Sequence, residues 1–454
     1  AGRNASHPIN SVSRNGLMLA DFSPGSILLS SGSYSSLNGL LFLSGFLLSK
    51  QLIEEYRQHG YLRVSYFYFR RLVRIVPAYF SCFFLYFFLR PQPQSCNVWT
   101  NAFFVNNFIS AETDSGCYDN SWIISLFVQL FTILPFIILG MFVRGTSKRD
   151  GGVALGWRVP AVLVLVGLAC RGFMLLGLSK DINRWHVSVK CKFDSWLFLK
   201  MSPFFVGVFF AMLQYEEVAR DAQDLVHVRT SLPAGSLSPL TGRSPERRTR
   251  RESWESSDSM FDEANVVSAS GNEHIFQAGR TARGGRRKGK CGVFINRWSP
   301  AVEICVALTV LVVTAVFSYH RSSTLLGMRM DVTLMLGGPT LFSIALGCLL
   351  SVVMRNRESV VAKFLAWSAF VPMSKCVYSM LLVQHVVTEE TAFFVANSLQ
   401  VSPTSNYVPW YFVTLFFCLV FSFVVGGLLY LLIEAPFRTC LNDKRKKIRM
   451  YQSS

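Results

Sequence analysis

The chain has 454 residues, of which 51% are hydrophobic and 16% are charged, and it includes 39 phenylalanines. This composition argues against a soluble protein and, together with long uncharged runs, predicts a membrane protein. The formal net charge of +18 lies mainly in the connections between apolar runs and in the C-terminal tail, as in cytosolic loops, so we expect no nucleic-acid partner.

Eleven cysteines are present, and many of them, such as Cys82 and Cys348, lie inside apolar segments. There a cysteine behaves as a small hydrophobic residue. The cysteines form neither a disulfide scaffold nor a set of ligands with the spacing of a zinc site. We therefore expect no metal site.

Residues 1–35 precede the first apolar run and are polar, with many serines and glycines and a glycosylation sequon at Asn4. The sequence begins at Ala1 and has no signal-like apolar run before Leu37. We interpret 1–35 as an outer polar segment, and we expect that the natural N-terminus is missing from this chain.

Apolar runs follow, each close to the length that a helix needs to cross a bilayer. They predict an all-α fold, a polytopic transmembrane helical bundle with about nine membrane helices. The predicted membrane segments are 36–52, 73–90, 121–143, 159–178, 195–214, 299–319, 331–354, 374–397 and 408–433.

The distribution of Lys and Arg predicts the orientation, because cytosolic connections carry more basic residues than outer ones. Loop 91–120 has no Lys or Arg, so we place it on the lumenal or outer side. Loop 179–194 is basic although the alternation places it outside, and a missed or extra helix would change this map. The basic connections assigned to the cytosol are 53–72, 144–158, 355–373 and the tail 438–454.

A long insert, 215–298, separates the membrane helices of 36–214 from those of 299–437. It is rich in Ser, Arg and Gly and has no hydrophobic periodicity. Such a composition cannot bury enough apolar surface to fold, so we predict a disordered cytosolic insert.

Arginines cluster at the head of the second apolar run, in the sequence Tyr-Phe-Arg-Arg-Leu-Val-Arg-Ile-Val-Pro. Arg70 and Arg74 are four positions apart, and Arg71 and Arg74 are three apart, so a helix would place them on one surface. Such a cluster can bind phosphate groups through bidentate hydrogen bonds. The alternative is a positive-inside anchor, the usual role of basic residues beside membrane helices.

The run Leu-Phe-Leu-Ser-Gly-Phe-Leu, with Ser44 at its centre, and the Arg-Arg-x-x-Arg-Ile-x-Pro motif after it resemble the membrane-bound acyltransferase-3 family. The resemblance implies that Arg70, Arg71 and Arg74 receive the phosphates of an acyl-CoA donor. It also adds Ser44 and Lys200 to the donor-binding candidates, since Lys200 stands where the family's Arg-x-x-Pro-x-x-x-Gly pattern has its arginine.

The longest match to this family runs from Phe364 to His385 and resembles its animal branch, the nose-resistant-to-fluoxetine-like proteins. In that branch the pattern Phe-Leu-x-Trp-x-x-Phe-x-Pro precedes a tyrosine and a Tyr-Leu-x-His sequence. Tyr378 and His385 are seven positions apart and so share a helix face. Both are catalytic candidates, because an ionisable residue in a membrane helix usually has a function. The alternative for His385 is a neutral histidine hydrogen-bonded between helices.

A third motif begins at Ser121 and contains Gln129, and it resembles the family's Ser/Thr-Trp helix with a glutamine seven positions after the tryptophan. Family members carry one or two carboxylates beside that glutamine, whereas this chain has Phe127 and Val128. It also has Asn38 where the family usually has aspartate. If those acids polarise the acceptor or a catalytic histidine, these departures impair the activity.

The outer loop before this motif resembles that of the animal branch in its tryptophan and asparagines. Cys96 and Cys117 flank it on the oxidising side of the membrane, which indicates a disulfide between them. A pair of free thiols is the alternative.

The two ends of the chain carry the last elements of the resemblance. The family's general base is thought to be a histidine ahead of the Ser-Gly-Phe helix, and His7 lies at about that offset from Ser44. The alternative for His7 is an incidental loop histidine. Glu434 begins a Glu-x-Pro-Phe sequence that resembles the family's final helix end and implies a structural cap near the basic motif.

We therefore expect an enzyme, a membrane acyltransferase that moves an acyl group from cytosolic acyl-CoA to an acceptor on the lumenal or outer side. Acyl-CoA would be the donor, membrane lipids and an unknown acceptor the partners, and the endoplasmic reticulum or plasma membrane the location. The alternative is a catalytically degenerate member that acts in lipid or small-molecule transport or uptake, as Asn38, Phe127 and Val128 favour.

Overall fold

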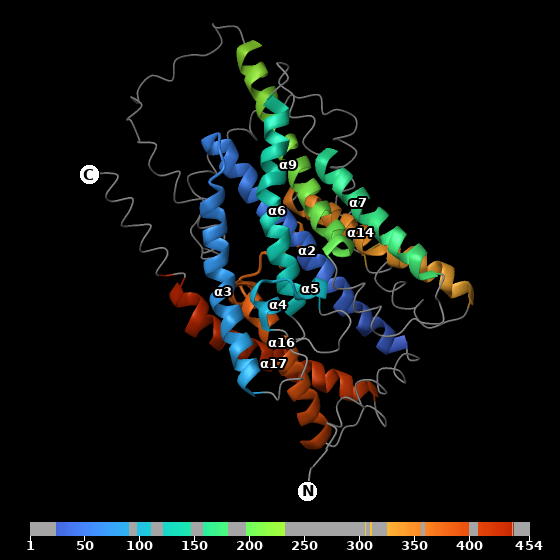
Figure 1. Cartoon of the computed structure of the whole chain (residues 1–454). Coiled ribbons are helices and arrows are strands. Elements are labelled where there is room, and N and C mark those ends of the chain that lie inside the picture. The colour runs from blue at the N-terminus through green and yellow to red at the C-terminus, as the bar shows by residue number, and fades with distance from the viewer. Residues whose placement is uncertain are drawn as a thin grey trace. The chain divides into compact units, whose positions relative to one another are not determined.

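The computed structural model describes a helical protein (Figure 1). All regular elements in the described residues are helices, which confirms the predicted all-α fold. The chain forms two compact units, one of Ala1–Glu216, Val306–Ser351 and Lys375–Ser454 and the other of Glu217–Cys305 and Val352–Ser374. Besides a few isolated residues, the described ranges are 24–89, 98–109, 121–146, 158–179, 197–231, 325–355, 359–398 and 407–437.

Long helices account for most of this structure. The helices are α2 (Pro24–His59), α3 (Val64–Leu89), α4 (Val98–Ala102), α5 (Asn106–Ile109), α6 (Ser121–Thr146), α7 (Arg158–Ser179), α9 (Leu197–Ser231), α14 (Leu325–Arg355), α15 (Val360–Leu365), α16 (Phe370–Ser398), α17 (Tyr407–Leu429) and the π-helical turn η5 (Tyr430–Glu434).

Six of the described helices contain a segment that is long and apolar enough to cross a membrane, or seven if the bent helix α16 is one span. The chain is thus a multi-pass membrane protein. Most predicted membrane segments coincide with a described helix, including 159–178 with α7. Segment 299–319 lies mostly outside the described residues, so the predicted number of nine stays a prediction.

Helices α2 and α9 are longer than predicted. α2 begins at Pro24, so the later part of the predicted outer segment 1–35 is helical; proline is tolerated in the first turn because its missing N–H would have no helical partner there. α9 continues to Ser231, into the predicted insert 215–298. Its added residues contain no Gly or Pro and include Glu, Ala, Arg, Gln and Leu, which favour helices. The rest of that insert lies outside the described residues.

Helices α2 and α9 approach each other so closely that no side chain fits at two glycines. A Cβ atom on Gly45 would lie 2.1 Å from the carbonyl oxygen of Phe204, and one on Gly207 would lie 2.2 Å from that of Phe42. Small residues at such reciprocal positions allow the backbones of membrane helices to pack directly. The Ser-Gly notch of α2 and the Pro-x-x-x-Gly pattern of α9 are therefore two halves of one contact.

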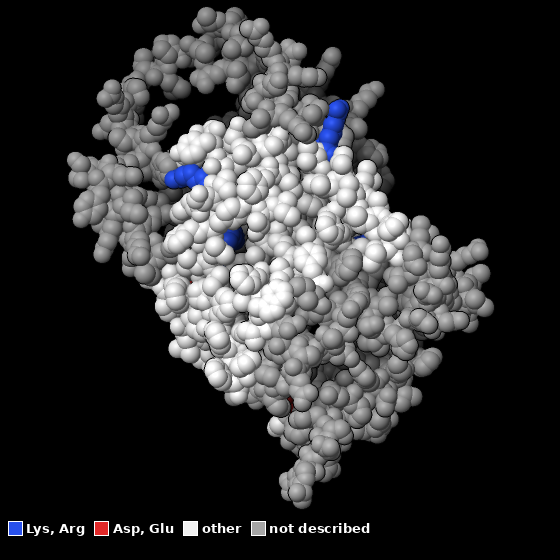
Figure 2. Space-filling view, viewed as in Figure 1, with Lys and Arg blue, Asp and Glu red and all other residues white. Residues whose placement is uncertain are grey.

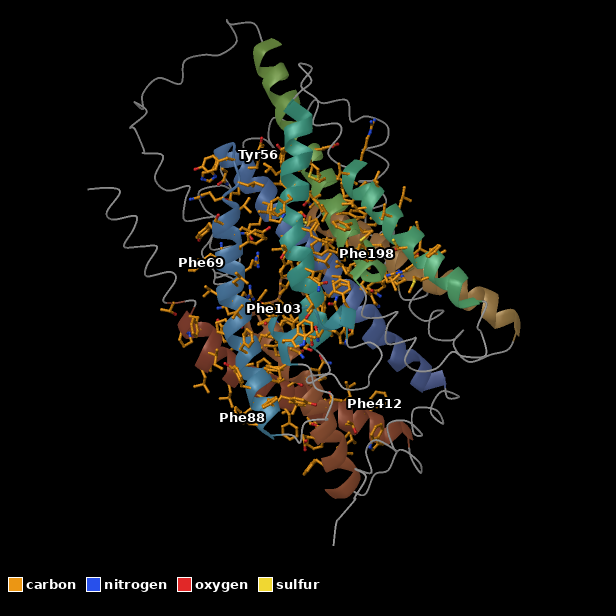
Figure 3. All side chains as sticks on the ribbon, viewed as in Figure 1. Tyr56, Phe69, Phe88, Phe103, Phe198 and Phe412 are labelled. Atoms are coloured by element: carbon orange, nitrogen blue, oxygen red, sulfur yellow. The ribbon has the colours of Figure 1, made fainter. Side chains whose placement is uncertain are left out.

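Aromatic rings join α2, α6 and α9 near one end of these helices. Tyr56 stacks on Phe142 with 4.1 Å between ring centroids, and Phe142 meets Tyr215 edge to face at 6.2 Å. Figure 1 shows the three helices side by side, and Figure 3 labels Tyr56 at this end of α2. α2 and α9 are therefore held together at two points along their length, directly at the glycines and through Phe142 of α6 at the rings.

The outer surface of the described residues is largely apolar, as a lipid environment requires. Figure 2 shows a face on which few charged side chains are visible among the described residues. Phe69 and Phe88 on α3 and Phe412 on α17 are labelled in Figure 3 and are 53%, 80% and 59% exposed. In a bilayer such side chains contact hydrocarbon instead of water, so their exposure here carries no hydrophobic cost.

Candidate functional site

The arginines of the basic motif lie within α3 and not in a turn before it, because α3 begins at Val64 and not at residue 73 as predicted. Arginine is a good helix former and can extend its charged end to the surface while its stem is covered. Arg70, Arg71 and Arg74 are all half-buried, and the helix places them on one surface, as their spacing predicts.

Arg71 is held by a neighbouring helix. Its Nη2 donates a hydrogen bond to Oε1 of Gln51 on α2 at 2.8 Å, and its guanidinium lies 5.6 Å from the ring centroid of Phe67. Gln51 carries no charge, so the positive charge of Arg71 is not neutralised by this contact. The contact therefore orients the guanidinium of Arg71 against α2.

Arg74 contacts the end of the last helix. Its Nε donates to Oε1 of Glu434 at 3.2 Å, and the Arg74 side chain is 23% exposed whereas that of Glu434 is 0% exposed. The other carboxylate oxygen of Glu434, Oε2, accepts a hydrogen bond from the Ser379 hydroxyl at 3.1 Å. Residues from α3, α16 and η5 therefore meet at one buried carboxylate.

Tyr378 lies beside this contact. Its hydroxyl donates to the backbone carbonyl of Ile75 at 2.9 Å, and its ring packs against a buried cluster that includes Tyr79 and Leu382. The carbonyl of Ile75 belongs to the α3 residue that follows Arg74. Tyr378 and the arginines, which are far apart in sequence, are thus brought together by the packing of α16 on α3.

His385 lies at a bend in α16. The axes of Phe370–Gln384 and Val386–Ala392 differ by 66°, and the Thr388 hydroxyl donates to the carbonyl oxygen of Gln384 at 2.7 Å. Such back-bonding from threonine bends helices. The side chain of His385 is outside what the structure describes, so the face that it shares with Tyr378 stays a prediction.

Ser44 and Lys200 lie close in sequence to the residues that form the contact between α2 and α9, and not beside the arginines of α3. Ser44 precedes Gly45, whose Cα approaches the carbonyl of Phe204, and Lys200 lies one turn before Phe204 and is 1% exposed. The structure does not join either residue to the arginines through a described contact. Their role in donor binding therefore stays a prediction.

Gln129 holds the outer loop onto α6. Its amide exchanges two hydrogen bonds with Asn107, of 3.0 and 2.8 Å, and its Nε2 also donates to the carbonyl of Phe104 at 2.8 Å. Phe104 has a φ of 57°, a backbone conformation that is uncommon outside glycine. Gln129 therefore stabilises the turn between α4 and α5.

Further asparagine contacts continue this network. Asn106 Nδ2 donates to Oγ of Ser121 and, at 3.2 Å, to Oδ1 of Asn101, while Oδ1 of Asn106 accepts from Ser125. The Tyr79 hydroxyl of α3 donates to the carbonyl of Asn101 at 3.3 Å. The loop asparagines and the glutamine of the third motif thus form a structural network that fastens α4 and α5 to α3 and α6.

Sequence reasoning missed two members of the arginine site, Gln51 and Ser379. Ser379 is a polar residue within an apolar stretch of α16, a signal that could have marked it for closer attention, whereas Gln51 lies among other polar residues at the end of α2. Their partners could not be read from spacing, because each bond joins different helices. His7, Cys96 and Cys117 lie outside the described residues.

Comparison with known protein families identifies the chain. A family model described as an acyltransferase domain, of the acyltransferase-3 type, matches residues 20–258, which is more than half of the sequence. The chain belongs to the acyltransferase-3 family. No curated protein and no solved structure was found to match it.

Membership of the acyltransferase-3 family indicates acyl transfer, which requires an acyl donor and an acceptor. The matched range contains α3 with its arginines, and also α6 and the buried part of α9. Tyr378, His385 and Glu434 lie beyond it. The family match therefore covers the α3 arginines but not the residues of α16 and η5 that contact α3.

Proposed function

We propose that this acyltransferase-3 protein moves an acyl group from cytosolic acyl-CoA to an acceptor on the lumenal or outer side of the membrane. The observation that carries the proposal is the arginine surface of α3, with Arg70, Arg71 and Arg74 half-buried on one side of a membrane helix. Guanidinium groups bind phosphates through charge-assisted, often bidentate hydrogen bonds. CoA has several phosphate groups, and its acyl chain can enter the adjoining hydrocarbon.

The proposed catalytic residues are Tyr378, His385 and His7, and Ser44 and Lys200 are proposed to assist donor binding. Support for Tyr378 comes from its position, since its hydroxyl contacts the α3 backbone directly after Arg74. His385 is proposed from its motif and from its place at the bend of α16. His7 is proposed from its offset in the sequence alone.

The finer assignment is to the animal, nose-resistant-to-fluoxetine-like branch, in the endoplasmic reticulum or plasma membrane. Its support is the Phe364–His385 match together with the tryptophan and asparagines of the outer loop. Membrane lipids would surround the enzyme, and the acceptor would reach it from the lumenal or outer side.

A second candidate is a degenerate family member that acts in lipid or small-molecule transport or uptake. The observation that favours it is the apolar packing beside Gln129. Phe127 is 8% exposed and its ring lies 5.7 Å from that of Phe131, while Val128 packs against the buried cluster around Tyr79. Hydrophobic residues therefore occupy the positions at which family members carry carboxylates.

Binding of a photoreactive acyl-CoA to the purified full chain tests the donor site. The double variant Arg71→Gln/Arg74→Gln should weaken binding about tenfold or more, because two charge-assisted phosphate contacts are lost. The matched control is Arg57→Gln/Arg63→Gln, which removes the same charge from residues that are exposed in the neighbouring connection.

The control should retain nearly full binding at the same salt concentration. Unchanged binding in Arg71→Gln/Arg74→Gln, or an equal loss in both double variants, would reduce the motif to a general positive anchor. A second assay distinguishes an enzyme from a degenerate transporter. An enzyme releases free CoA from acetyl-CoA in membranes that contain the wild-type chain, whereas a degenerate transporter releases none.

A further inference from the structure

Glu434 is an acid placed where a membrane protein rarely keeps one. It is 2% exposed and ends the π-helical turn η5 (Tyr430–Glu434), two residues before Pro436. A π turn within an α-helix is uncommon and often marks a functional position. Burial of a carboxylate is costly unless its oxygens are hydrogen-bonded, and both oxygens of Glu434 have a donor.

The contact of Arg74 with Glu434 orients the guanidinium group. Nε of Arg74 donates to Oε1 of Glu434 at 3.2 Å. An arginine has five N–H donors in one rigid plane, so a contact at Nε sets the orientation of that plane. The Arg74 side chain is 23% exposed.

Two residues of α16 hold the groups beside Arg74, namely the Glu434 carboxylate and the backbone of Ile75. Ser379 donates to the second oxygen of Glu434 at 3.1 Å, so the carboxylate cannot turn away from Arg74 without losing that bond. The adjacent Tyr378 donates to the carbonyl of Ile75, the neighbour of Arg74, at 2.9 Å. Two consecutive residues of α16 thus hold both the backbone and the ion-pair partner of one arginine.

We propose that Glu434 is a positioning residue of the donor site, which orients Arg74 toward a phosphate group of CoA while Ser379 orients Glu434. This inference rests on the proposed function, because it assumes that the α3 arginines bind an acyl-CoA. A carboxylate near an anion site would by charge alone weaken binding of the anion. The two explanations therefore predict opposite effects when the charge of Glu434 is removed: positioning predicts weaker binding of CoA, and simple electrostatics predicts tighter binding.

The test measures the dissociation constant of desulfo-CoA for the full chain in nanodiscs, with wild type, Glu434→Gln, Arg74→Gln and the double variant. Glu434→Gln should weaken binding about fivefold, although it makes the protein more positive, because Arg74 loses the charged group that orients it. In the Arg74→Gln background the same change should have no further effect. Glu216→Gln, which alters another buried acid, is the matched control and should bind as wild type does.

Tighter binding in Glu434→Gln would show that Glu434 competes with the phosphate, and unchanged binding would show a packing role only; either result overturns the proposal. An equal loss in the presence and absence of Arg74 would overturn it as well. If Glu434→Gln does not fold, Ser379→Ala supplies the same cycle with Arg74→Gln, and additive effects there refute the proposal. Absence of desulfo-CoA binding by the wild-type chain would refute the proposed function itself.

Discussion

Replacement of Gly45 by alanine tests the contact between α2 and α9. The new Cβ atom would lie 2.1 Å from the carbonyl oxygen of Phe204, and real Cβ atoms essentially never lie within 3.0 Å of another heavy atom. The helices must therefore separate by about 0.9 Å, the difference between these two distances. No flexible side chain can move aside instead, because the atom that is struck belongs to the backbone.

The cost follows from the kind of contact. Overpacking costs about 1–3 kcal/mol, and the replacement of a helical glycine by alanine recovers about 0.5–1 kcal/mol. Since a backbone atom yields less than a side chain, the upper values apply, and we expect a net loss of about 2 kcal/mol. For a chain of 454 residues, an unfolding entropy of about 2.1 cal/mol/K per residue makes this a fall in Tm of about 2 °C.

The assay is the fraction of monodisperse protein that remains in detergent after heating. Gly427→Ala is the control, because a Cβ atom there meets nothing within 4 Å, and its Tm should equal or exceed that of the wild type. The double variant Gly45→Ala/Gly207→Ala should lose less than the sum of the single variants, since the first substitution has already separated the helices. A Gly45→Ala protein that melts like Gly427→Ala would refute the close packing.

Removal of the Gln129 amide by Gln129→Leu leaves Asn107 without its amide partner and should destabilise the protein by about 1–3 kcal/mol, measured by the same melting assay; an unchanged Tm would exclude the network from stability. Tyr378→Phe deletes only the hydroxyl that donates to Ile75, so Tm should fall slightly, corresponding to about 1 kcal/mol, and desulfo-CoA should still bind; lost binding would place the hydroxyl in the donor site. An impermeant thiol reagent should not label Cys291 in intact cells, and labelling would invert the predicted orientation.

The sequence was sufficient to predict the helices and the shared surface of the arginines, because long apolar runs and a three- and four-residue spacing have few structural meanings. It was not sufficient to predict that Arg74 meets Glu434. These residues are 360 positions apart, and only the family resemblance placed Glu434 near the basic motif. A contact between helices depends on the packing of the whole bundle, which local spacing does not encode.

Helix boundaries were also missed, for a physical reason. α3 begins at Val64, and its first turns mix aromatic and polar residues. An apolar run in the sequence ends at the membrane surface, whereas the helix continues beyond it. The glycine contact shows the same limit. Gly45 and Gly207 were each noticed within a motif, but only three-dimensional packing shows that each accommodates the other's helix.

The contact of Arg74 with Glu434 also has a consequence for biosynthesis. The ribosome makes α3 before η5, and 360 positions separate Arg74 from Glu434, so at roughly 5–20 residues per second Arg74 waits on the order of 20–70 s for its carboxylate. During that interval another anion, such as a lipid headgroup, can neutralise the nascent helix. A chain terminated before Glu434 would retain α2, α3 and their glycine and glutamine contacts, yet it would never complete the arginine site. Completion of the proposed donor site would thus report that synthesis has reached η5.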